Sequence, residues 1–151
     1  MPDFILVLVG LSAALACGSC GGGLYEFSVV DPVWPRRPEL IQPDRGGISR
    51  KRFWMPAHGA FELTLLVSIF ITWSQPLVRA CLIVALASHA VMRIWSAFDF
   101  IPKALAFERA DPASIEEAKA RSWTLRSLWR LPLDLVTSAA MLSAFATLAR
   151  M

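Results

Sequence analysis

The chain has 151 residues, of which 56% are hydrophobic and 18% are charged, and its formal net charge is +3. Its mean hydropathy of +0.51 excludes an ordinary soluble domain and indicates one compact membrane domain. The basic residues do not indicate a nucleic-acid-binding protein, because they lie in loops beside apolar segments, where membrane orientation and anionic lipids account for them.

The first apolar segment, residues 4–24, is long enough to cross a membrane, since a transmembrane helix needs about 20 residues. No Lys or Arg precedes it, and it is too long for the apolar part of a signal peptide, so we predict a retained helix. Cys17 and Cys20 match the C-x-x-C pattern of redox proteins. In a helix rich in small residues, each also serves as one more small apolar group.

The stretch that follows, residues 28–56, is a predicted loop. It carries prolines at positions 32, 35, 38 and 43 and the pair Gly46-Gly47, which exclude a regular helix or a central strand. Trp34 and Ile41 within it predict that the loop folds back onto the bundle rather than extending into solvent.

Three further spans are predicted at residues 57–73, 77–100 and 131–149, and Pro102 is expected to end the third. Residues 115–129 mix basic and apolar side chains at helical spacing, which is typical of an interfacial amphipathic helix. The predicted fold is therefore all-α, a bundle of four transmembrane helices. It has a proline-rich first loop and an amphipathic helix before the last span.

The distribution of basic residues predicts the orientation of this bundle. The two long loops lie on one side and carry twelve Lys and Arg residues, whereas the other side carries only Arg79 and Arg150. The positive-inside rule then places the long loops in the cytoplasm and both termini outside. We expect a multi-pass protein of the cell (plasma or inner) membrane, with anionic lipids near its basic loops. The oligomeric state is left open.

Nearly all ionisable side chains in the apolar segments fall toward the side of the long loops. Charges at membrane depth are costly and persist mainly where they pair or line a functional cavity. All four helices are therefore expected to contribute to one cytoplasmic-side pocket. The residues concerned are Glu26, His58, Glu62, His89, Arg93, Asp99 and Asp134.

The deepest members of this set are Glu62, His89 and Arg93, which are the first catalytic candidates. His58 precedes Glu62 by four residues, and His89 precedes Arg93 by four, so each pair shares a helix face. An ion pair between Glu62 and Arg93 that only joins two helices is the alternative. Asp99 is a further candidate, although it also fits a solvated charge near a helix end, as do Glu26 and Asp134.

Two aromatic residues are candidates for binding a substrate, and no cofactor is predicted. Trp54 and Trp95 are placed to line the pocket, but an interfacial anchor is the simpler explanation for Trp54 and core packing is the simpler one for Trp95. A metal is disfavoured because no Glu-x-x-His pair occurs and Arg93 adds positive charge. A bis-histidine haem is disfavoured because His58 and His89 lie at different depths.

Several short motifs resemble a known family. They are GGLYE at 22–26, DPVWP at 31–35, FWMPAH at 53–58 and RIWSAFDFIP at 93–102. Together with four spans, they resemble the small integral-membrane family that includes the anthrone oxygenases of aromatic polyketide pathways. The resemblance implies a four-helix membrane bundle.

In the oxygenase members, the resemblance also implies cofactor-independent oxidation of an anthrone to an anthraquinone, with Trp54, His58, Arg93 and Asp99 as the matching residues. A base removes an acidic proton, a cation stabilises the enolate, and the carbanion reduces oxygen directly. Two other hypotheses stay open. One is a non-catalytic membrane subunit whose loops bind a partner or anionic lipid, and the other is a thiol-redox protein using Cys17 and Cys20.

Overall fold

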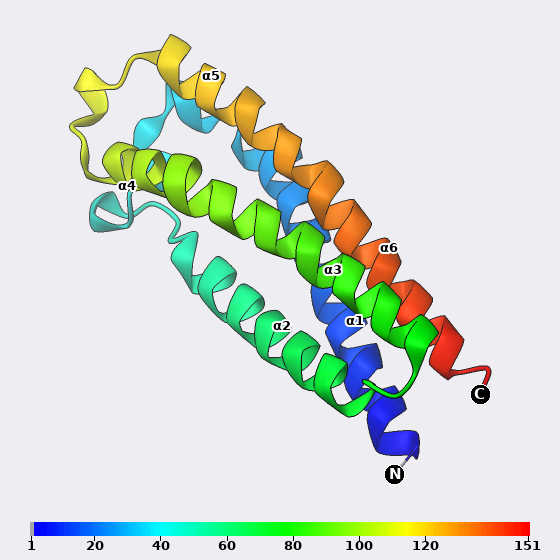
Figure 1. Cartoon of the computed structure of the whole chain (residues 1–151). Coiled ribbons are helices and arrows are strands. Elements are labelled where there is room, and N and C mark those ends of the chain that lie inside the picture. The colour runs from blue at the N-terminus through cyan, green and yellow to red at the C-terminus, as the bar shows by residue number, and fades with distance from the viewer. Residues whose placement is uncertain (1) are drawn as a thin grey trace.

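The computed structural model describes residues 2–151 and is all-helical, with 86% of the chain in helices. The described residues contain no β-strand. Four continuous helical rods are long and apolar enough to cross a membrane: Asp3–Val30, Lys51–Ile71, Pro76–Arg109 and Glu117–Leu148. This confirms the predicted all-α bundle of four spans (Figure 1).

The first rod consists of α1 (Pro2–Tyr25) and a π-helical turn, Glu26–Val30, that continues it. The proline-rich segment then forms short 3-10 turns instead of a long helix, because each proline lacks the amide that a helix needs. Trp34 and Ile41 are fully buried, and Gln42 donates from Nε2 to the Phe107 carbonyl at 2.8 Å. The prediction that this loop folds back onto the bundle is confirmed.

The second rod, α2 (Lys51–Ile71), starts at Lys51 rather than near residue 57, with Pro56 inside it. A proline close to a helix start removes only one intrahelical hydrogen bond, so the helix extends past it. A short turn then leads to α3 (Pro76–Trp95), as the sequence predicted.

The third rod joins α3 to a π-helical turn, Ser96–Phe100, and to α4 (Ile101–Arg109). The prediction that Pro102 ends this helix is wrong. The Ile101 amide bonds to the Ser96 carbonyl five residues back, which widens the backbone just before the proline. Pro102 then occupies the first turn of α4, where its missing amide removes no hydrogen bond.

The fourth rod comprises α5 (Glu117–Ser127), a 3-10 turn at Leu128–Arg130, and α6 (Leu131–Leu148). The amphipathic segment predicted at 115–129 is thus helical from Glu117, and it runs directly into the last span (Figure 1). The 3-10 turn precedes Pro132, which again sits in the first turn of the following helix.

Packing within the bundle is uneven. Helix α1 packs against α2 and α6, and α3 packs against α6, whereas contact between α2 and α3 is sparse. Both termini and the α2–α3 turn lie at one end, here called the closed end, and the long loops lie at the other, the loop end (Figure 1). Small residues such as Ala13 and Ala16 let α1 approach its neighbours closely in the main core.

A second, aromatic cluster closes the loop end. The ring of Trp34, from the first loop, lies 5.2 Å from Phe107 of α4 and 5.9 Å from Trp123 of α5. Phe100 lies 6.0 Å from Trp123 in the same cluster. The folded loop therefore acts as a roof, and a hollow remains between this roof and the four helices.

Candidate functional site

The hollow under the aromatic roof, here called the loop-end cavity, has a volume of about 310 Å³. All four rods and the first loop contribute to its lining. Its apolar lining includes Phe27, Met55, Met92, Phe100, Ile101, Leu105, Leu128 and Leu131. Its ionisable lining comprises Glu26, Asp31, Arg50, Lys51, His58, Arg93, Glu108, Arg130 and Asp134.

Both π-helical turns lie at this cavity. The first turn contributes Glu26 and Phe27 to the lining, and the second contributes Ser96 and Phe100. Single π turns within α-helices are frequent at functional sites, because they redirect the side chains that follow. The two turns occur in different rods at the same end of the bundle, and they shape opposite walls of one cavity.

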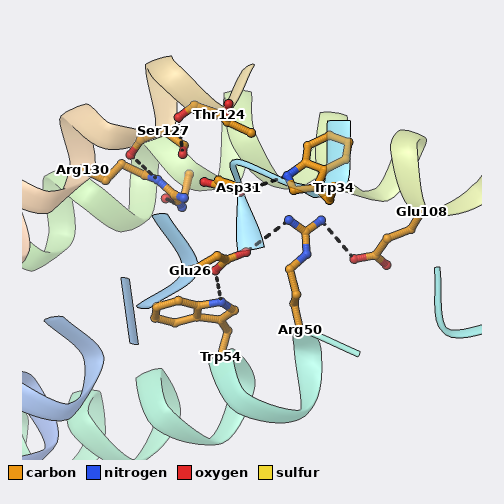
Figure 2. Close-up of polar contacts among 10 residues, drawn as sticks. Glu26, Asp31, Trp34, Arg50, Trp54, Glu108, Thr124, Ser127 and Arg130 are labelled. Carbon is orange, nitrogen blue, oxygen red and sulfur yellow. Dashed lines mark hydrogen bonds and ion pairs between the residues drawn. The ribbon is translucent and has the colours of Figure 1, made fainter. Parts of the chain in front are cut away.

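One wall is held by a network around Arg50, whose side chain is only 9% exposed. Its Nη1 lies 3.2 Å from Glu26 Oε1 and its Nη2 lies 3.5 Å from Glu108 (Figure 2). Trp54 donates from Nε1 to the other Glu26 oxygen at 2.8 Å. Lys51 pairs with Glu108 at 3.1 Å. These charges are neutralised by one another, so the network joins the first π turn, the start of α2 and α4 in one wall.

Asp31 is buried directly after the first π turn. Its Oδ1 accepts a hydrogen bond from Trp34 Nε1 at 2.9 Å (Figure 2). Burial, followed by the neighbouring Glu26 carboxylate, raises the pKa of Asp31 to about 6. The first loop therefore carries an acidic group that is partly protonated near neutral pH.

Arg130 differs from Arg50 in its partners. Its Nη1 lies 3.3 Å from Ser96 Oγ, its Nε lies 3.3 Å from the Ser127 carbonyl, and its guanidinium lies 4.6 Å from the Phe100 ring centre. Among residues 2–151, no carboxylate forms an ion pair with Arg130 within 4.0 Å, and the carboxylates of Glu26, Asp134 and Asp31 interact with it only from farther away. Arg130 thus presents a positive charge to the cavity, and several of its N–H groups make no hydrogen bond to the described residues.

Two further groups on the lining have unused bonding capacity. His58 stacks on Trp54 at 5.3 Å and 18°, and its buried Nδ1 has no hydrogen-bond partner in the described part of the chain. Asp134 lines the cavity and forms neither an ion pair nor a hydrogen bond with any described residue. The cavity therefore brings together an imidazole, a carboxylate and a guanidinium that are available to a bound molecule.

The structure brings the predicted trio together. Glu62 Oε1 lies 2.8 Å from Arg93 Nε and 3.1 Å from His89 Nε2, so these groups bond one another and link α2 to α3. Only Arg93 of the three lines the loop-end cavity. All three line a second hollow of about 300 Å³ on the seam between α2 and α3, here called the α2–α3 groove. Its other lining residues are Leu66, Leu86, Ala90 and Ile94.

The remaining predicted residues divide between the cavity and the exterior. His58 and Trp54 line the cavity. Asp99 does not, because its carboxylate is paired with Lys103 and Arg126. Trp95 packs against Phe100 at 5.3 Å, which is the core-packing role that the sequence left open.

The two cysteines of the C-x-x-C motif lie outside both hollows. Cys17 is exposed on α1, whereas Cys20 is buried, and neither lines the cavity or the groove. Between residues 2 and 151, no cluster of three or more His, Cys, Asp or Glu side chains is arranged to hold a metal ion.

Arg50, Asp31 and Arg130 are cavity residues that sequence reasoning missed. In the sequence, Arg50 and Arg130 belong to the basic loops whose charge predicts the orientation, and Asp31 belongs to the motif DPVWP. The aromatic residues of the first loop were the sequence feature that could have predicted Asp31 as a cavity residue. Trp34 is buried against the bundle, so residues next to it in the loop, such as Asp31, also lie against the bundle.

No protein-family model matches the chain, and neither the curated proteins nor the solved structures contain a significant match to it. Function is therefore inferred from the geometry of the two hollows.

Proposed function

We propose that this multi-pass membrane protein binds a small, flat lipophilic molecule carrying an acidic or strongly polarised oxygen in the loop-end cavity. The main support for this proposal is the position of Arg130. It faces a largely apolar cavity, and no carboxylate of the described chain lies within 4.0 Å of it. The volume of about 310 Å³ lies at the small end of the range for ligand pockets, roughly 300–1,000 Å³.

The contrast between the two arginines supports an anionic or polarised ligand group. Arg50 is paired with Glu26 and Glu108, so its charge is neutralised within the wall, although its buried Nη2 has no hydrogen-bond partner among the described residues. A guanidinium in an apolar cavity gains most when an oxygen anion accepts its free donors, because charge-assisted hydrogen bonds are the strong ones. Phe100, which lies beneath Arg130, is 1% exposed, so a flat ring system packs instead against the more open apolar lining, such as Met55 and Ile101.

The location of the ligand follows from the charge asymmetry of the chain. The loop end carries the basic loops, so we place it on the cytoplasmic side by the positive-inside rule. The ligand is then drawn from the cytoplasmic leaflet or from the cytoplasm.

Binding is tested with 9-anthracenecarboxylate and its neutral counterpart 9-anthracenemethanol, titrated into the protein in lipid nanodiscs. Arg130→Gln is expected to weaken carboxylate binding about tenfold or more, since a hydrogen bond to a charged group is worth roughly 1.5–3 kcal/mol. Binding of the neutral alcohol is expected to change less than about twofold, because its ring contacts remain.

Arg126→Gln is the matched control. It makes the same change one turn earlier in the same rod, at a side chain paired with Asp99. Equal weakening by both variants would assign the effect to general charge, and the absence of saturable binding to either compound would overturn the proposal.

A second candidate function is proton abstraction by His58, which is favoured by its unpartnered Nδ1 and by the Trp54 stack that holds its ring. On an anthrone, His58 takes a proton from the ring carbon and Arg130 stabilises the enolate oxygen. Dioxygen is the oxidant: one anthrone and one O₂ give one anthraquinone and one water. This is the reaction that the resemblance to the anthrone oxygenases implies.

The enzymatic candidate is tested by anthraquinone formation and oxygen uptake with anthrone as substrate. His58→Gln is expected to lower the rate by about 10²-fold or more, which is typical of the loss of a general base. His89→Gln is the control and is expected to retain most activity, since His89 lines only the groove. An inactive wild-type protein that still binds the carboxylate would remove the enzymatic candidate alone.

A further inference from the structure

We infer that the α2–α3 groove is a lateral entrance through which a lipophilic molecule passes from the bilayer into the loop-end cavity. The Glu62–Arg93 ion pair lies at its inner rim. This inference rests on the proposed function, because it requires a lipophilic occupant for the cavity.

The groove and the cavity follow one another along the same seam. Arg93 lines both hollows. On α2, Met55 and His58 line the cavity, and the next residues on that face, Glu62 and Leu66, line the groove. Their spacing of three or four residues places them in one row along the helix. A molecule in the groove is therefore one helical turn from the cavity.

The seam between α2 and α3 is also the loosely packed side of the bundle. The other neighbouring helices pack closely, and α2 and α3 contact each other sparsely. The side chains of Glu62 and Arg93 are 40% and 37% exposed, compared with 9% for Arg50 inside the bundle. The ion pair thus faces outward, where it is reached from the surroundings of the protein.

The depth of the groove points to lipid rather than water as those surroundings. At about 1.5 Å of rise per residue, the backbone of Glu62 lies about 14 Å from Ile71 and that of Arg93 about 26 Å from Pro76, and their charged groups, 2.8 Å apart, share one depth between these values. Both lie within a hydrocarbon core of about 30 Å. Leu66, Leu86 and Ile94 give the groove an apolar lining that matches lipid chains or a lipophile.

An outward-facing ion pair at that depth is costly, and such charges persist mainly beside a functional path. The pair places a polar group between the apolar groove and the ionisable side chains of the cavity. Arg93 lines both hollows, so it lies where the passage between them runs.

The entrance is tested by the kinetics of 9-anthracenecarboxylate supplied in phosphatidylcholine vesicles to protein in nanodiscs. The anthracene group of the probe is excited directly, and not by energy transfer from tryptophan. Leu66→Trp fills the groove and is expected to slow both association and dissociation about tenfold, with the Kd changed less than about twofold, because only the path is altered. Ala90→Trp, on the facing helix, is expected to do the same.

Leu63→Trp is the matched control, because Leu63 lies one turn from Leu66, is 65% exposed, and does not line the groove. Unchanged rates in both groove variants, with normal affinity, would overturn the entrance while leaving the proposed function intact. Absence of binding in the wild-type protein would instead overturn the proposed function, and the entrance with it. The second groove variant keeps the test decisive if the first fails to fold.

Discussion

At the scale of single residues, the loop end shows two uses of a buried arginine. Arg50 pairs with carboxylates from the first π turn and from α4, so its removal leaves Glu26 without a cation and leaves Glu108 with Lys51 alone. Arg130 forms no ion pair with the described residues, so its removal breaks no ion pair of the wall and takes a donor from the cavity. The first arginine stabilises the fold, and we propose that the second binds the ligand.

Asp31 gives a pH-dependent prediction at this scale. Its pKa is raised to about 6 from an ordinary value of 3.8. Between these two pH values, Asp31 is therefore mostly protonated in the folded protein and mostly ionised in the unfolded chain. This difference lowers the free energy of unfolding as the pH rises from about 4 to about 6, by on the order of 2–3 kcal/mol in total. Asp31→Asn keeps the acceptor for Trp34 and removes this dependence.

The measurement is the midpoint of thermal unfolding in detergent at several pH values. Above pH 6, Asp31→Asn is expected to be more stable than the wild-type protein, and near pH 4 the two are expected to converge. Asp44→Asn is the control, since Asp44 is exposed in the same loop. A constant difference across the whole pH range would contradict the prediction. The nearby charges are Glu26, Arg50 and Arg130, and all are retained in both variants.

Residue spacing was sufficient to predict one group of contacts and not another. The i, i+4 pairs and similar depth predicted that Glu62, His89 and Arg93 lie close together, and they bond one another. The availability of Arg130 and Asp134 to a ligand could not be predicted. It depends on the π turn at Ser96–Phe100 and on the unbroken α5–α6 rod, which set where these side chains lie.

At the scale of elements, proline explains why the span boundaries were harder to predict than the spans. Pro102 and Pro132 each follow a turn with non-α hydrogen bonding, and both then occupy the first turn of a new helix without ending the rod. Apolar length predicts a span because crossing lipid requires it. The π turn has no comparable requirement in the sequence, so the extension of the third rod to Arg109 was not foreseen.

The first loop gives a prediction at the same scale. A Cβ at Gly47 would lie 2.7 Å from the Leu40 carbonyl oxygen and 2.8 Å from the Gln42 amide nitrogen, and both are backbone atoms that cannot rotate away. Gly47→Ala is therefore expected to displace the loop and destabilise the protein by about 2 kcal/mol or more. Faster cleavage by trypsin within the first loop is the measurement.

Gly18→Ala is the matched control for this change. A Cβ there meets nothing within 4 Å, and alanine favours a helix over glycine by roughly 0.5–1 kcal/mol. Its trypsin sensitivity is expected to equal that of the wild-type protein. Equal sensitivity in the Gly47→Ala variant would show that the loop is not held as the structure describes.

At the scale of the whole molecule, the bundle is closed on three sides and open on the fourth. The contacts of α1 with α2 and α6, and of α3 with α6, form a continuous packed unit, and the sparse α2–α3 seam completes the ring. The closed end contains the aliphatic core and the loop end contains the aromatic roof. The aliphatic core thus lies toward one end of the bundle, and the loop-end cavity lies at the other.

The orientation of the molecule is tested by thiol labelling in intact cells. In a variant with Cys17, Cys20 and Cys81 replaced by alanine, Met151→Cys is expected to react with a membrane-impermeant maleimide. Arg109→Cys is expected to react only after permeabilisation, because the twelve basic residues of the long loops favour the cytoplasm. The reverse pattern would place the loop end outside.

The two π turns have a consequence for changes in chain length. Each carries one residue more than an α turn over the same stretch of helix, at Glu26–Val30 and Ser96–Phe100. Deleting one residue there would convert the turn to α geometry and leave the helix beyond it nearly in register, because the extra residue is absorbed within the turn. The Arg50–Glu108 contact beyond the second turn and the Asp31–Trp34 contact beyond the first would then be retained. We therefore expect natural variants with single-residue gaps at these turns to keep the loop end and to change only the side chains that the turns present to the cavity.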